Sequence, residues 1–518
     1  MADKAARRRR YGQIAALIVA CVGAPALAQN QAPLSVIDWL GAQSDTGLRP
    51  SPSAPDTNEP PIAKTALAPN VSVQTLDEGS PREIGLVPPR ITGLPTDIWA
   101  GSDPTELTRL ISALPDPTLP AGQSLLYTIL LAEAGAPGGK ASAGDALALA
   151  RVEKLVALGA LDPALSLIEQ AGVTTSPAHF DLWMEISLLT GTEDRACAVL
   201  SAAPHLTADY GIRIFCDARA RKWDNAALTF GSAQALGLLP PEKLALIARF
   251  LDPEAFEAEA PLVPPRKMDP LTFRLFEAIG EPIPTGNLPR PFAVADLRDL
   301  SGWKAQIEAA ERLTRAGALP DNRILGLYTD RKPAASGGVW DRVAALQRFE
   351  TALTTGSVDA VSKTLPAVWT LMAEAGLEVA FASLFADALG TMELEGRAAQ
   401  VAMDIQLLSA GYESAATRLG VESLPAQIAK GSVTSNRPAD MTKAAVHDAF
   451  DTALPRADLV AMVKQDRLGE AILQVLSLLH SGTQGNARAL TEALATLRAL
   501  GLEDTARRAA IQTLLLER

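Results

Sequence analysis

Apolar residues recur at helical spacing along most of this chain, and no other feature constrains its fold as strongly. Leu107, Leu110, Ile111 and Leu114 show the spacing near its start, and side chains placed in this way line one face of an α-helix. Similar segments follow one another towards the C-terminus, and between residues 142 and 250 the loops that separate them have two to five residues. Such short loops make consecutive helices antiparallel neighbours. The sequence therefore predicts an all-α fold, an α-solenoid of antiparallel helical hairpins.

The composition agrees with a helical fold. Alanine and leucine supply most of the 48% of residues that are hydrophobic, whereas aromatic residues make up only 5% of the 518. β-branched residues are sparse, which favours helix over sheet. This composition excludes a collagen-like or disulfide-dense chain, and it is too apolar for disorder throughout.

A short pattern repeats within the first helical region at offsets of 32 and 30 residues. Its three copies read Ala164-x3-Ile168-x2-Ala171, Ala196-x3-Leu200-x2-Ala203 and Ala226-x3-Phe230-x2-Ala233. Gly159 and Gly191 stand five residues before the first alanine of their copies, and Arg221 takes the corresponding place in the third. Phe180 and Tyr210 stand sixteen residues before theirs. This spacing resembles a degenerate tetratricopeptide repeat, and the resemblance implies a stacked superhelix that binds proteins or peptides on its concave face.

Residues 1–28 have the pattern of a secretory signal peptide. A basic stretch ending at Arg10 precedes an apolar stretch from Ile14 to about Ala24, and Ala26-Leu27-Ala28 forms a small-x-small cleavage site. This pattern predicts export, and we expect a periplasmic protein.

A second interpretation applies to the same segment. Ile18-Val19-Ala20-Cys21 resembles a bacterial lipobox, in which acylation of Cys21 would produce a membrane-anchored lipoprotein. Simple cleavage after Ala28 is favoured because it allows a longer apolar stretch. In either case we expect no transmembrane span in the mature chain, since no other stretch reaches the roughly 18 apolar residues that a spanning helix needs.

Removal of residues 1–28 makes the protein more acidic. The full chain has a net charge of −12, and the remainder has 42 basic and 58 acidic residues, a net charge of −16. Phosphate backbones repel such a chain, so we expect no nucleic-acid partner.

The two remaining cysteines, Cys197 and Cys216, are expected on consecutive antiparallel helices near 192–203 and 207–221. An even pair in an oxidising compartment is typical of a structural disulfide. Two buried free thiols are the alternative. The Cys-x-x-Cys spacing of redox catalysis is absent.

Prolines divide the chain into regions. We expect a disordered linker at 29–95, a first helical repeat region at 96–251, a Pro-rich connection at 252–292 and a second helical region at 293–518. Within the linker, one short apolar island could dock on a partner or fold back as a local helix, and it contains Val36, Ile37, Trp39 and Leu40. A second island, Val71–Pro95, contains prolines that should exclude helix and favour an extended arm along the helical body.

No catalytic, metal-binding or cofactor-binding signature accompanies these helices. The four histidines do not form His-x3-His, and phosphate-binding loops and nucleophile elbows are absent. We therefore expect no cofactor and a non-enzymatic periplasmic adaptor that binds protein or peptide partners of an envelope assembly. Two alternatives stay open: an accessory or enzyme of peptidoglycan turnover, because periplasmic lytic transglycosylases also use helical superhelices, and a lipid-anchored structural spacer.

Overall fold

A computed structural model describes residues 83–298, 300–420 and 422–516 of the protein, all within one compact unit, Gln74–Arg518. Within these ranges the chain forms α-helices and short 3-10 turns, with two isolated β-bridges and no longer strand. The predicted all-α class is confirmed. No helix in the described part is both long and apolar enough to cross a membrane.

The first helices run from the start of the described region to the end of the Pro-rich connection. They are α3 (Pro89–Thr92), α4 (Pro104–Ala113), α5 (Pro120–Leu131), α6 (Ala141–Leu158), α7 (Leu161–Ala171), α8 (Pro177–Thr190), α9 (Glu193–Ala202), α10 (Tyr210–Arg219), α11 (Trp223–Ala235), α12 (Pro241–Leu251) and α13 (Pro270–Ala278).

The remaining helices follow, several of them in antiparallel pairs. They are α14 (Ala293–Asp296), α15 (Trp303–Thr314), α16 (Asp321–Thr329), α17 (Val339–Thr354), α18 (Val358–Glu374), α19 (Glu378–Leu389), α20 (Gly396–Leu408), α21 (Tyr412–Leu419), α22 (Leu424–Ala429), α23 (Met441–Asp451), α24 (Ala457–Val463), α25 (Leu468–Thr483), α26 (Ala487–Ala499) and α27 (Glu503–Leu515).

Several helices begin at residues whose side chains cap the helix N-terminus. Asp103, Ser176, Asp269 and Asp440 each accept a hydrogen bond from a backbone N–H in the first turn of the helix that they precede. These side chains satisfy amide groups that have no partner inside the helix. Proline often occupies the first helical position, where its missing N–H costs nothing.

The segment before α4 departs from the sequence expectation. Ile84 and Val87 form β-bridges to Ala134 and Ala132, so this part does lie along the helical body. The expectation that prolines exclude helix was wrong for one turn, because α3 begins at Pro89, a position that tolerates proline. The Arg151 guanidinium, buried beneath this segment, donates hydrogen bonds to the backbone carbonyls of Ile84, Leu130 and Ala132.

Two short helices, α16 and α22, are not indicated by the helical spacing of apolar residues. Helix α16 begins directly after Pro320, and α22 contains Pro425. Both are short, and packing rather than local propensity stabilises helices of this length. The side chains of Ala426, Ile428 and Ala429 are buried where α22 packs on α27.

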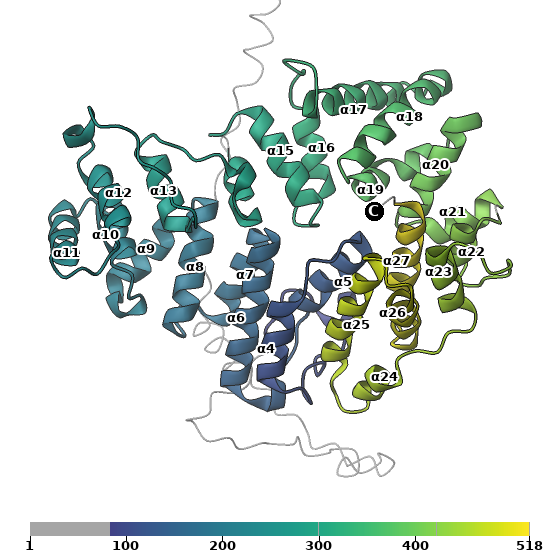
Figure 1. Ribbon diagram of the computed structural model, residues 1–518, viewed down its shortest axis with the longest axis horizontal. Helices are drawn as coiled ribbons and strands as arrows, with labels where there is room; N and C mark the ends of the chain where they lie inside the picture. Colours follow the sequence, from purple (N-terminus) through teal and green to yellow (C-terminus); the bar gives the residue numbers. More distant parts are fainter. Residues whose placement is uncertain (1–82, 299, 421, 517–518) are drawn as a thin grey trace, which may run out of the picture. The chain divides into compact units, whose positions relative to one another are not determined.

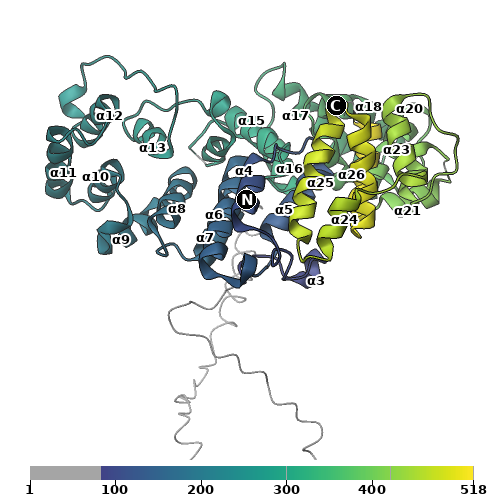
Figure 2. The same ribbon diagram turned by 60° about the horizontal axis from the view of Figure 1, so that its bottom comes forward.

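The last helices pack against the first. Helix α27 contacts α5, and α25 contacts both α4 and α5 (Figure 1). Figure 2 shows α25 beside α5 from a second direction. Backbone hydrogen bonds connect Gly101 N to Asp466 O and Gly469 N to Ile98 O, each at 2.9 Å. The C-terminal helices therefore pack against the start of the described region, which local helix patterns do not predict.

The Pro-rich connection also folds back onto earlier helices. Its helix α13 packs on α8, and a 3-10 turn at Arg290–Phe292 packs on α6. Glu193, buried at the start of α9, lies 2.8 Å from Arg274 of α13 and 3.6 Å from Arg219 of α10. The end of α15 lies next to α5, through hydrogen bonds from Gln123 and Tyr127 to the carbonyls of Arg315 and Ala316, and a large cleft opens there.

Candidate binding cleft between distant helices

The structure joins one predicted pair of site residues. Cys197 of α9 and Cys216 of α10 form a disulfide with a Cα–Cα distance of 5.0 Å. The lipidation alternative at Cys21 and the docking-segment residues Val36, Ile37, Trp39 and Leu40 lie outside the described residues.

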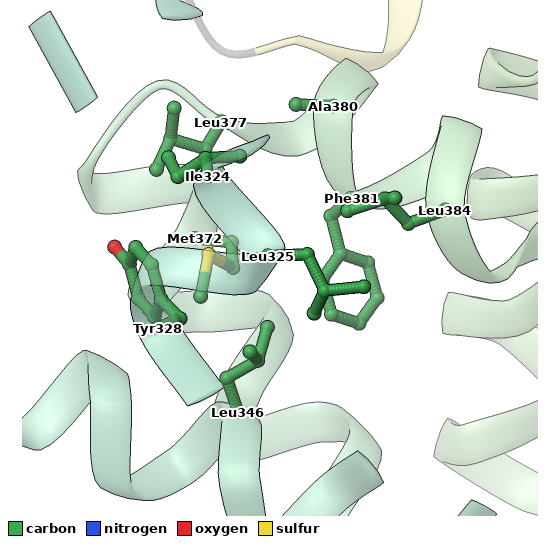
Figure 3. A pocket seen from close by; sticks show the side chains of 9 residues that line it. All are labelled: Ile324, Leu325, Tyr328, Leu346, Met372, Leu377, Ala380, Phe381 and Leu384. Atoms are coloured by element: carbon green, nitrogen blue, oxygen red, sulfur yellow. The ribbon is translucent and has the colours of Figure 1, made fainter. Parts of the chain in front are cut away.

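A wholly apolar pocket lies among α16, α17, α18 and α19 (Figure 3). It is lined by Ile324, Leu325, Tyr328, Leu346, Met372, Leu377, Ala380, Phe381 and Leu384, and its volume is about 20 Å³. A space of this size holds about one water molecule. The Tyr328 hydroxyl points away from Phe381 in Figure 3 and donates a hydrogen bond to Glu311 at 2.6 Å. The pocket is therefore a small gap in the core and offers no room for an organic ligand.

A much larger cleft of about 810 Å³ opens where four parts of the chain meet, and we call it the arginine cleft. The loop before α5, the end of α6, the region from Arg290 to Ala316 and the end of α18 form its walls. Its lining residues are Asp116, Pro117, Thr118, Gln123, Ala157, Leu158, Arg290, Arg312, Arg315, Ala316, Ala373, Glu374, Ala375 and Gly376. The charged residues in this lining are three arginines, one aspartate and one glutamate.

One of the three arginines is paired with a carboxylate. Arg290 Nη1 lies 2.7 Å from Asp116 Oδ2, and the buried Lys154 Nζ lies 3.2 Å from Asp116 Oδ1. Lys154 also donates to the Leu114 carbonyl at 2.6 Å. Burial raises the pKa of Asp116, but the hydrogen bond from Arg290 and the charges of Lys154 and Arg290 outweigh it and lower that pKa overall. Asp116 therefore remains a carboxylate at neutral pH.

The other two arginines bind backbone carbonyls. Arg312 donates to Thr285 O at 3.1 Å and to Leu288 O, and Arg315 donates to Ala375 O at 3.0 Å. Neither forms an ion pair with a carboxylate of the described residues. Burial, followed by the charges of Arg290 and Arg315, lowers the pKa of Arg312. A guanidinium still keeps its proton at neutral pH, so positive charge accumulates in this cleft.

A second cleft of about 530 Å³ adjoins the first, and we call it the apolar cleft. The two share Gln123, Arg315 and Gly376. Most of its lining is apolar, with contributions from Leu131, Leu319, Leu377, Val379 and the prolines at 120, 163 and 320. It also carries Asp162 and Asp321.

The wall between the clefts is held by hydrogen bonds between distant segments. Gln123 Nε2 donates to Pro117 O at 3.0 Å and to Arg315 O at 2.9 Å. The Tyr127 hydroxyl donates to Ala316 O at 3.0 Å. These bonds hold α5 against the end of α15, so the wall between the clefts is formed without any ligand.

The chemistry of the two clefts suits recognition. Arginines supply planar donors for carboxylate or phosphate groups, and apolar walls bury hydrocarbon. Sequence reasoning did not find this site, because Arg290 and Asp116 lie 174 residues apart in the chain. A local signal is the three-residue spacing of Arg312, in the last turn of α15, and Arg315, the residue that follows this helix.

Comparison with known proteins found no matching family model, no matching curated protein and no matching solved structure.

Proposed function

We propose that this protein is a non-enzymatic adaptor of the cell envelope that holds a segment of a partner protein across its two adjacent clefts. The observation that carries this proposal is the size and adjacency of the clefts, about 810 and 530 Å³ with three lining residues in common. Volumes of this order accommodate substantial ligands. The signal-peptide pattern of residues 1–28 supports placement in the periplasm.

The helical body supports the same function. Segments from residues 116 to 380 contribute to the walls, and hydrogen bonds between them hold their spacing. A preformed site of this kind reduces the ordering cost of binding. The resemblance of the first helical region to tetratricopeptide repeats supports a protein or peptide as the occupant.

Site-specific photocrosslinking in intact cells tests the proposal. A photoreactive amino acid replaces Ser124, an exposed residue that lines the apolar cleft, and in a matched strain it replaces Ser232, an exposed residue of α11. We expect the Ser124 position to crosslink one defined envelope protein, identified by mass spectrometry, and the Ser232 position not to do so.

Other outcomes of this experiment contradict the proposal. Absence of any protein adduct at Ser124, or the same adducts at both positions, would remove its support. A glycan adduct at Ser124 would favour peptidoglycan turnover instead. The mass of the mature N-terminus separates the export alternatives, because a chain starting at acylated Cys21 differs from one starting at Gln29.

A further inference from the structure

We propose that the occupant of the clefts is a peptide segment with acidic residues at one end and apolar residues at the other. This inference rests on the proposed function and specifies the partner's chemistry. The acidic end binds Arg290, Arg312 and Arg315, and the apolar end lies in the apolar cleft.

The arginine cleft carries more positive than negative charge, because its lining has three arginines against Asp116 and Glu374. Arg312 and Arg315 bind only carbonyl oxygens among the described residues, and Arg290 shares Asp116 with Lys154. Three guanidinium groups around one cleft repel one another, and an incoming carboxylate relieves that repulsion. Arginine and carboxylate also form strong charge-assisted hydrogen bonds. This local charge is opposite in sign to the net charge of −12 of the whole chain.

The other end of the site has a different character. Leu131, Leu319, Leu377 and Val379 give it apolar walls. Asp162 and Asp321 also line it and disfavour acidic groups there, and burial raises the pKa of Asp321. The two ends therefore fix the direction of a bound segment, because reversing it would place carboxylates near Asp162 and apolar side chains among the arginines.

Peptide titration with the purified mature protein tests this directly. The probe is a fluorescein-labelled peptide with a block of glutamates followed by a block of leucine and valine, in both block orders, and anisotropy measures its binding. The comparison peptide has glutamine in place of every glutamate. We expect the glutamate peptide to bind at least about tenfold more tightly, and its affinity to fall as salt concentration rises.

Substitutions identify the responsible side chains. Arg312→Gln together with Arg315→Gln should weaken the glutamate peptide about tenfold or more and leave the glutamine peptide nearly unchanged. Arg348→Gln together with Arg397→Gln removes the same charge from exposed positions outside the cleft lining and should leave both unchanged. Arg315→Gln alone is included as a variant that should still fold, because Arg315 is exposed and its side chain makes one hydrogen bond.

A substitution that should increase the affinity for the glutamate peptide completes the test. Asp116→Asn removes a carboxylate from the cleft and frees Arg290, so the glutamate peptide should bind more tightly. Equal affinity for the glutamate and glutamine peptides, or equal effects of the cleft and control substitutions, would overturn the inference. If Ser124 crosslinks a partner through a segment without acidic residues, the adaptor function stands and this inference fails. If the glutamate peptide binds but no protein crosslinks in cells, the adaptor function fails.

Discussion

Three successive hairpins end their first helix with a residue in the left-handed conformation. Gly159 and Gly191 have φ of 84° and 79°, and Arg221 has φ of 60°. In the third case Lys222 N donates to Asp217 O and Arg221 N to Ala218 O, the bond pattern of a Schellman cap. Arg221 stands where the third copy of the repeat lacks glycine. It adopts the same left-handed backbone conformation as Gly159 and Gly191.

Replacement of Arg221 by glycine should stabilise the protein. The left-handed conformation costs a non-glycine residue about 1–2 kcal/mol. Glycine avoids this cost but has more conformational entropy in the unfolded chain, which offsets part of the gain in stability. We expect Arg221→Gly to raise the free energy of unfolding by about 0.5–1 kcal/mol in urea titration. Gly191→Ala is the reverse control, because a Cβ there meets its nearest atom at 3.5 Å and only the backbone is strained. It should lower the same quantity, and a shift of both variants in one direction contradicts the argument.

Residue spacing aligned Arg221 with the two glycines and indicated the cysteine pair, because both features depend on neighbours close in sequence. Gly159, Gly191 and Arg221 were aligned by their spacing from buried alanines, and 19 residues separate the cysteines. The arginine cleft depends instead on contacts between residues far apart, such as Gln123 with Arg315. No local pattern reports such contacts, and this explains why the sequence did not indicate the site.

At the scale of elements, helices with a clear apolar spacing were predictable, and two short ones, α16 and α22, were not. Apolar spacing indicates helix over residues 142–158, 339–355 and 412–419, and the structure has α6, α17 and α21 within one residue of these limits. Helix α22, only six residues long, contains Pro425 and lacks enough turns to show a period. Its position depends on burial against α27, information that a single segment does not contain.

The disulfide ties α9 to α10 and should contribute to the stability of this hairpin. Closing a loop of this length restricts the unfolded chain by about 3 kcal/mol. The ion pair of Arg219 with Asp194 joins the same two helices at 2.6 Å but is largely exposed and adds little. We expect reductant to lower the free energy of unfolding, followed by circular dichroism, by about that amount.

A double variant provides the control for this prediction. Cys197→Ala together with Cys216→Ala should show the lower stability without reductant, and reductant should then have no further effect. An equal response of both proteins to reductant would show that the disulfide is not the cause. Alkylation of Cys197 and Cys216 in exported protein before any reduction would contradict their pairing in the cell.

At the scale of the whole molecule, the junction of the first and last helices depends on a close contact at a glycine. The Trp99 side chain is fully buried there, and a Cβ placed on Gly469 would lie 2.4 Å from its ring. Hydrogen bonds between residues 98–101 and 466–469 accompany this contact. A methyl group at position 469 must therefore separate the two segments or displace the indole.

Gly469→Ala tests whether this junction contributes to the cooperativity of the whole protein. Overpacking of this kind costs about 1–3 kcal/mol. We expect the free energy of unfolding to fall by that amount, and the backbone amides of residues 101 and 469 to exchange hydrogen faster. Gly231→Ala in α11 is the matched control, because a Cβ there has nothing within 4 Å and helix propensity favours alanine by about 0.5–1 kcal/mol. Opposite signs for these two substitutions indicate that the contact with Trp99 is responsible. If Gly469→Ala leaves both unfolding and exchange unchanged, the contact between Trp99 and Gly469 does not hold the first and last described helices together.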